Sequence, residues 1–177
     1  MMVLPKQYEY LASEPGPKML IEALKLLGTK EITGKKHSPE ILEWADELEL
    51  ENLYSNDEIP WCGLFVAIVA KRGEKEVPKN PLWALNWQHF GRPVKDAMLG
   101  DVLVFRRKSG GHVGLYVGED RTAYHVLGGN QGNEVNITRI LRNRLHAIRR
   151  PTWKIAQPAN VRKIFLNTQG HVSTNEA

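Results

Sequence analysis

The sequence predicts a single α+β domain in which helices come first and an antiparallel sheet follows, and three observations carry this prediction. Over the first half of the 177 residues, apolar side chains recur at helical spacing behind proline-containing starts. Over the second half, short alternating or β-branched runs are separated by glycine turns. Because no helix is expected between these runs, neighbouring strands are expected to pair antiparallel, in a central sheet of about five strands.

Three helices are expected before residue 74. The first follows a Pro-Gly-Pro turn and covers residues 17–28, the second covers 38–48, and the third covers 62–73. The third segment is apolar on nearly all sides, which indicates a helix buried in the core. Its β-branched residues would also suit a strand, but its length and the cationic residues before its final glycine favour a helix. A shorter helix is expected after Asn80 and Pro81.

Five strands are expected in the second half of the chain, over residues 102–105, 112–118, 123–127, 134–138 and 145–149. In the second of them, His112, Gly114 and Tyr116 share one face, and the valines and leucine between them share the other. Because glycine has no side chain, Gly114 is expected to leave room beside His112 for the helix that carries Cys62.

The domain is expected to cover residues 1–151, with 152–177 as a C-terminal extension that is frayed from Gly170 onward. The start of the chain has no apolar run of signal-peptide length, and no window approaches ~18 consecutive apolar residues. We therefore expect synthesis in the cytoplasm without a signal peptide and without an integral membrane segment.

The composition indicates a mildly basic domain that is stabilised by packing alone. A net charge of +4 and a pI of about 9.2 attract polyanions such as nucleic acid, anionic lipid or the bacterial envelope. The single cysteine excludes an internal disulfide and a cysteine-rich zinc site. The six histidines are scattered without ligand spacing, so neither a metal nor another cofactor is expected.

Two side chains are candidates for nucleophilic catalysis. Cys62 begins the apolar helix, where the positive end of the helix dipole favours the thiolate; the alternative is a small buried apolar residue. His112 follows the Gly110-Gly111 turn at the first position of a strand, and an imidazole there suits a general base; the alternative is a surface histidine.

A third polar side chain is expected to orient this imidazole. Asn130, in the turn after the third strand, offers a side-chain oxygen for this purpose, and Gln131 is the reserve. The alternative is ordinary turn chemistry, in which glycine and asparagine predominate. The order cysteine, histidine, asparagine along the chain is that of papain-like hydrolases.

Four segments resemble the motifs of the NlpC/P60 and CHAP superfamily of small bacterial and phage peptidoglycan hydrolases. They are residues 58–66 around Cys62, 99–105, 111–118 around His112, and 126–131, and the resemblance extends over about residues 12–151. Two features depart from the family pattern. Gly128 and Gly129 stand where many CHAP members carry a glutamate, and His125 lies before the turn rather than at the third-histidine position of many NlpC/P60 members.

The resemblance implies a papain-like fold and hydrolysis of an amide bond in the cell-wall peptide by a Cys–His–Asn mechanism. The enzyme would be an endopeptidase or an N-acetylmuramoyl-L-alanine amidase, of the phage-type endolysin class, and a secreted antibacterial effector is an alternative. It is expected to be a monomer that acts on the wall after release or export. Other interpretations are a Cys–His amidase, peptidase or acyltransferase with a non-wall substrate, and an envelope- or nucleic-acid-binding domain without catalysis. The last ranks lowest because no nucleic-acid-binding motif is present.

Several further residues are weaker candidates. The backbone N–H of Cys62 is expected to donate to an oxyanion, and Asn56 is a possible second donor. Trp61 is a candidate wall of a substrate groove, although tryptophan at helical spacing is more often part of the core. Asp57 lies where some CHAP relatives bind Ca²⁺, but a solvated acidic loop is the simpler interpretation.

Overall fold

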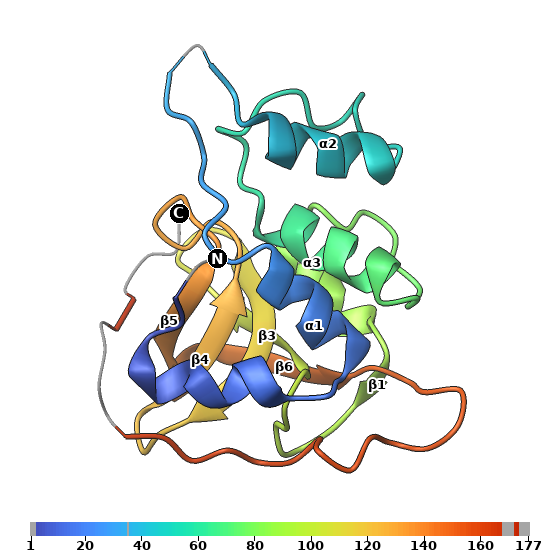
Figure 1. Cartoon of the computed structure of the whole chain (residues 1–177). Coiled ribbons are helices and arrows are strands. Elements are labelled where there is room, and N and C mark those ends of the chain that lie inside the picture. The colour runs from blue at the N-terminus through green and yellow to red at the C-terminus, as the bar shows by residue number, and fades with distance from the viewer. Residues whose placement is uncertain (1–2, 35, 168–171, 174–177) are drawn as a thin grey trace.

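The computed structural model describes residues 3–34, 36–167 and 172–173, and it shows helices packed on an antiparallel sheet, as the sequence predicts (Figure 1). The helices are η1 (Lys6–Ser13), α1 (Lys18–Lys25), α2 (Pro39–Glu47), α3 (Cys62–Arg72), η2 (Ala84–His89) and η3 (Arg142–Arg144), of which the η elements are 3₁₀. The strands are β1 (Arg92–Pro93), β2 (Val102–Arg106), β3 (Gly111–Glu119), β4 (Ala123–Gly128), β5 (Asn136–Leu141) and β6 (Leu145–Arg150).

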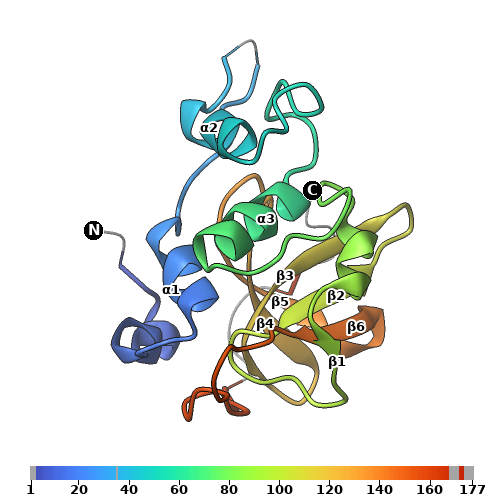
Figure 2. The same ribbon diagram turned by 90° about the vertical axis from the view of Figure 1, so that its right-hand side faces the viewer.

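The three predicted α-helices are confirmed, and α3 is the central one. Every residue of α3 from Cys62 to Ala70 is buried, because α1 and α2 pack against it on one side and β3 on another. Figures 1 and 2 show α3 between the other two helices and the sheet. Its all-round apolar surface therefore has a partner on each side. The short helix expected after Pro81 is the 3₁₀ helix η2.

The sheet has the order β1-β6-β2-β3-β4-β5, with antiparallel pairing throughout. The strand that the sequence does not predict is β1, a two-residue edge strand paired with β6. The strand predicted over 134–138 lies instead at Asn136–Leu141. The backbone of Glu134 and Val135 is engaged elsewhere, because Val135 exchanges hydrogen bonds with Gly28 and Thr29 after α1.

Both faces of the sheet are buried. Val113, Leu115 and Val117 of β3 contact the helical core, whereas Tyr116 belongs to a second core on the opposite face, so the predicted alternation is confirmed. The expected role of Gly114 is wrong. A Cβ there would lie 2.5 Å from Val126 Cγ1, so the missing side chain admits β4 rather than the helix that carries Cys62.

The C-terminal extension packs on the same sheet. The backbone N–H of Glu119, at the end of β3, donates to Ile164, and Leu166 donates back to Glu119. Further on, Ser173 donates to Arg139 of β5. Most of the segment expected to be frayed, from Gly170 onward, lies outside the described residues.

A buried ion pair explains the aspartate at the entry to β2. Arg150 of β6 donates from Nε and Nη2 to the two carboxylate oxygens of Asp101, at 2.9 and 2.8 Å. Asp101 also accepts the backbone N–H of Met98 at 2.8 Å. Burial raises the pKa of Asp101, and the guanidinium of Arg150 opposes that rise. The pair joins the start of β2 to the end of β6.

A second buried polar network ties the N-terminal segment to β4 and β5. His125 of β4 is fully buried, with Nδ1 2.6 Å from the Tyr8 hydroxyl and Nε2 2.8 Å from Asp120 Oδ2. Arg139 donates to the same carboxylate oxygen at 2.7 Å. Since both ring nitrogens of His125 have partners here, its role in the fold is to connect η1 with β4.

Candidate active site

Cys62 lies at the first position of α3, directly after the Pro60-Trp61 turn. Its thiol lies near the backbone N–H groups of Val113 and Gly63, both of which act to lower its pKa. The N–H groups of the first helical turn have no carbonyl partner within the helix, since the first intrahelical bond runs from Phe65 to Trp61. The effect of Val113 indicates that the thiol lies close to the residue that follows His112.

The thiol is 4% exposed and lines a cavity of about 370 Å³. Three segments of the chain form this cavity: the turn before α3, the segment before η2, and the turn between β2 and β3. The lining residues are Ile59, Pro60, Cys62, Leu82, Trp83, Ala84, Arg107, Ser109, Gly110 and Gly111.

Burial raises the pKa of the Cys62 thiol above its ordinary value. The hydrogen bonds from Val113 and Gly63 and the positive charge of Arg107 act in the opposite direction but do not outweigh it. Burial thus opposes the effect that the helix start is expected to have on the thiol of the free protein. A nucleophilic Cys62 needs a base that removes its proton during attack.

His112 is the candidate base. It is 1% exposed at the start of β3, where it pairs with Phe105 of β2 in the sheet register and stacks on that ring at 6.5 Å between centroids. Its Nε2 lies 3.0 Å from Gln131 Oε1. The partner that the structure shows for this nitrogen is therefore Gln131, the reserve candidate, rather than Asn130.

The hydrogen bonds of Gln131 determine which of its side-chain atoms faces the histidine. Its Nε2 donates to the carbonyl oxygens of Val126 and Asn136, at 3.1 and 2.8 Å, and neither oxygen could be satisfied by the Gln131 oxygen. The amide oxygen therefore points to His112, whose Nε2 must carry the proton in order to donate. In the neutral imidazole the lone pair is then on Nδ1, and a general base needs such a lone pair.

Gly128 permits this contact. A Cβ at this position would lie 2.7 Å from Gln131 Oε1 and 3.3 Å from His112 Nε2. The glycine that departs from the CHAP pattern thus lets the backbone approach the histidine–glutamine pair closely.

Asn130 does not take the position expected of it. It is buried, its backbone lies in the left-handed region at φ 57°, and among the described residues its Oδ1 has no hydrogen-bond partner. The longer side chain of Gln131 reaches back across the turn to His112. A further pairing holds the turn, since Asn136 Nδ2 donates to the Gln131 carbonyl at 2.8 Å. Gln131 and Asn136, five residues apart, bond to one another and close the loop between them, so two amide residues at this spacing are a sequence signal for such a loop.

The weaker candidates are distributed differently from expectation. Trp61 is fully buried and donates to Glu31 at 3.0 Å, so it belongs to the core rather than to a groove wall. Asn56 is half-buried and does not line the cavity. Trp83, in contrast, is 60% exposed at the cavity. Arg107 also lines the cavity and was missed at the sequence level.

Asp57 is a structural carboxylate. It is fully buried and accepts backbone N–H groups from Ile32 and Ser38, at 3.0 and 2.7 Å, and it lies 2.9 Å from His37 Nδ1. Burial alone would raise its pKa, but these hydrogen bonds hold it below the ordinary value. Asp57 therefore fixes the loop before α2. In the described part of the chain, no group of three or more His, Cys, Asp or Glu side chains is arranged to hold a metal ion.

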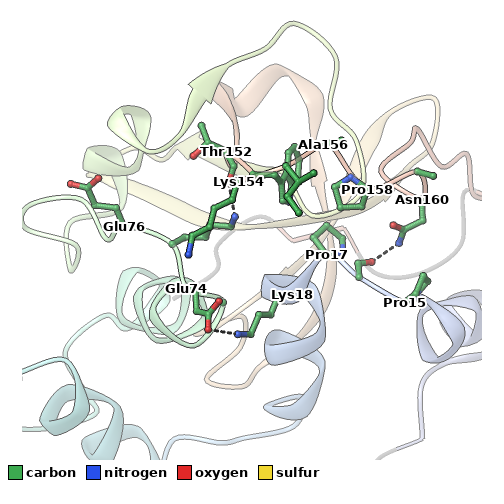
Figure 3. Close-up of a pocket in the computed structure, with 16 residues that line it drawn as sticks. Pro15, Pro17, Lys18, Glu74, Glu76, Thr152, Lys154, Ala156, Pro158 and Asn160 are labelled. Atoms are coloured by element: carbon green, nitrogen blue, oxygen red, sulfur yellow. Dashed lines mark hydrogen bonds and ion pairs between the residues drawn. The ribbon is translucent and has the colours of Figure 1, made fainter.

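A larger cavity, of about 810 Å³, lies away from this site, between the start of α1, the end of α3 and the segment after β6 (Figure 3). Its lining includes the Lys18–Glu74 ion pair and Asn160, which donates to the Gly16 carbonyl (Figure 3). It holds neither the cysteine nor a histidine. The nucleophilic chemistry available to the chain is thus at the smaller cavity.

Comparison of the sequence with known protein families and with curated proteins finds no match. Among the described residues, no helix is long and apolar enough to cross a membrane.

Proposed function

We propose that the protein is a cysteine hydrolase of papain-like fold in which Cys62 is the nucleophile, His112 the general base and Gln131 the residue that orients the base. The observation that carries the proposal is the hydrogen bond from His112 Nε2 to Gln131 Oε1, since the bonds of Gln131 set the tautomer that leaves Nδ1 basic. The effect of the Val113 N–H on the pKa of the Cys62 thiol supports it, because it indicates that the nucleophile lies near the strand of the base.

In the proposed reaction, His112 Nδ1 takes the thiol proton as Cys62 Sγ attacks the carbonyl carbon of an amide. The N–H groups at the start of α3, those of Cys62 and Gly63, have no carbonyl partner within the helix and are placed to donate to the resulting oxyanion. His112 then protonates the leaving amine, and the C–N bond breaks to give a thioester. Water, deprotonated by His112, hydrolyses the thioester and restores the thiol.

The proposed substrate is an amide in the peptide part of peptidoglycan. The resemblance of the segments around Cys62 and His112 to the NlpC/P60 and CHAP superfamily supports it, and the net charge of +4 suits an anionic wall. The enzyme would act as an endopeptidase or an N-acetylmuramoyl-L-alanine amidase, in the manner of a phage-type endolysin that reaches the wall after release.

Mass spectrometry of purified peptidoglycan digested with the wild type and with Cys62→Ser tests the proposal. We expect muropeptide fragments with new free amines in the wild-type digest and none with Cys62→Ser, since an alkoxide is much harder to form than a thiolate. Circular dichroism of both proteins controls for folding. Intact muropeptides in the wild-type digest, from a folded protein, would exclude a wall substrate.

A further inference from the structure

Trp83 lines the cavity of the nucleophile with a side chain that lies largely in solvent. It is 60% exposed, whereas Trp61 and Trp87 are fully buried. The indole N–H groups of the two buried rings have partners inside the protein. Trp61 donates to Glu31 at 3.0 Å, and Trp87 donates to the Pro81 carbonyl at 2.9 Å. The exposed ring of Trp83 is thus the tryptophan at this site that is not needed to fill the core.

Contacts with two glycines fix the chain on either side of Trp83. A Cβ at Gly63, the residue after the nucleophile, would lie 2.3 Å from the Pro81 carbonyl oxygen. A Cβ at Gly111, the residue before the base, would lie 2.6 Å from Leu85 Cδ2. Because glycine lets a neighbouring segment approach closely, the segment that carries Trp83 packs directly against both the helix of the nucleophile and the strand of the base.

Hydrogen bonds hold the backbone of this segment on both sides of Trp83. The backbone N–H of Trp83 donates to the Asn80 carbonyl at 3.1 Å, and that of Asn86 donates to the Trp83 carbonyl at 2.9 Å. The Asn86 side chain also donates to the Lys79 carbonyl at 2.9 Å. A ligand that contacts the ring therefore does not have to order the backbone that carries it, which lowers the entropy lost on binding.

The surroundings of Trp83 favour a flat ligand with an apolar face. The same cavity is lined by the apolar side chains of Ile59, Pro60 and Leu82. An aliphatic side chain gains most from an enclosed pocket, because it is then buried on all sides. A ring that is 60% exposed instead offers a platform on which a second ring stacks while its polar edge stays in water. A sugar ring has this character, since its C–H groups form apolar faces and its hydroxyl groups point outward.

We propose that Trp83 is a specificity-determining residue that stacks on a sugar ring directly beside the scissile amide. The inference rests on the proposed function, because the ring belongs to the substrate of that reaction. In peptidoglycan, the amide nearest to a sugar is the one that joins N-acetylmuramic acid to the first alanine of the peptide. A sugar platform at the cavity of Cys62 therefore favours the amidase over the endopeptidase.

Two compounds that share this amide test the inference. N-acetylmuramoyl-L-alanyl-D-isoglutamine carries the sugar, and D-lactoyl-L-alanyl-D-isoglutamine has the same acyl group without the sugar ring. We expect the ratio of kcat/KM for the first to that for the second to fall about tenfold in Trp83→Ala, as the loss of one ring stacked on an aromatic side chain implies. Trp83→Phe should keep part of the preference, because a smaller aromatic face remains.

Phe165→Ala is the matched control. Phe165 is an aromatic residue that is 74% exposed and does not line the cavity, so the ratio in this variant should equal that of the wild type. Binding is measured without hydrolysis in Cys62→Ser by NMR of nitrogen-15-labelled indole groups. The Trp83 signal is the one that is absent when Trp83→Phe is added. We expect the sugar-bearing compound to shift this signal and the lactoyl compound to leave it in place.

The two measurements separate this inference from the proposed function. A shift of the Trp83 signal without digestion of the wall would mean that the proposed reaction is wrong while the sugar platform stands. Wall digestion with an unchanged ratio in Trp83→Ala would overturn this inference alone, and so would wall digestion that leaves the muramoyl–alanine amide intact. An equal loss of kcat/KM on both compounds would also overturn it, because Trp83 would then act on the peptide or on the fold.

Discussion

Replacing Gln131 with methionine tests the orientation of the base most directly. Methionine keeps the length and approximate volume of the side chain but removes the oxygen that accepts from His112 Nε2 at 3.0 Å. A buried donor without an acceptor costs about 1–3 kcal/mol. Because each 1.36 kcal/mol is tenfold in rate, kcat/KM on wall fragments should fall by about 5- to 150-fold if that cost is expressed in the transition state.

Two measurements separate positioning from simple destabilisation. Nitrogen-15 NMR of histidine-labelled protein reports the tautomer of His112, which should be the Nε2–H form in the wild type and a mixture of tautomers in Gln131→Met. Asn130→Gly is the matched control. It removes the adjacent amide while glycine tolerates the φ of 57°, and the lost Oδ1 has no hydrogen-bond partner in the described part of the chain. Its activity and its His112 tautomer should match the wild type.

The opposite pattern would refute this reasoning. If Gln131→Met keeps its activity and the Nε2–H tautomer while Asn130→Gly loses both, Asn130 is the orienting residue, as the chain order first indicated. A fall in activity with an unchanged tautomer and a lowered melting temperature would assign Gln131 to the fold alone, through its bonds to Val126 and Asn136.

Three further outcomes are expected. Since burial raises the pKa of Cys62, its alkylation by iodoacetamide should still accelerate with pH beyond ~8.5, the ordinary thiol value, and a rate that levels off below pH 7 would instead indicate a resting thiolate–imidazolium pair. Burial lowers the pKa of His125, and hydrogen bonds hold the pKa of Asp120 low despite burial, so the folded state binds fewer protons than the unfolded state. The free energy of unfolding in urea should therefore fall as the pH drops through ~6.5 and again through ~3.9. The variant His125→Gln should lack the first fall. Asp101→Ala should lower the free energy of unfolding by about 3–5 kcal/mol, because Arg150 is left buried without its partner. The double variant Asp101→Ala/Arg150→Met should lose less of that free energy. Equal losses would mean that the buried charge of Arg150 is not the cause.

The parts of the fold that could be predicted are those determined locally. A proline opens α1 and α2, and the apolar run of α3 has few alternatives to a buried helix. The sequence places the start of β5 too early because Val135 bonds with residues after α1, more than a hundred positions away. The contact between Tyr8 and His125, 117 residues apart, has the same origin, since nothing in either local sequence specifies the other.

The residues of the candidate site likewise fall into those that local sequence predicts and those that depend on distant contacts. Cys62 at a helix start and His112 at a strand start follow from local pattern. The choice between Asn130 and Gln131 does not, because it depends on which side chain can reach back past Gly128. Arg107 was missed since its place at the cavity depends on how the β2–β3 turn meets the segments before α3 and η2.

Gly128 helps to keep the proton of His112 on Nε2. The histidine–glutamine pair is bounded at this point by main chain, with no room for even a methyl group. Main chain within a paired strand has no rotamers to exchange, so thermal motion of neighbouring side chains cannot open the pair from this direction. In the proposed mechanism, the proton on Nε2 would thus stay in place on the Gly128 side of the pair while substrates bind and leave.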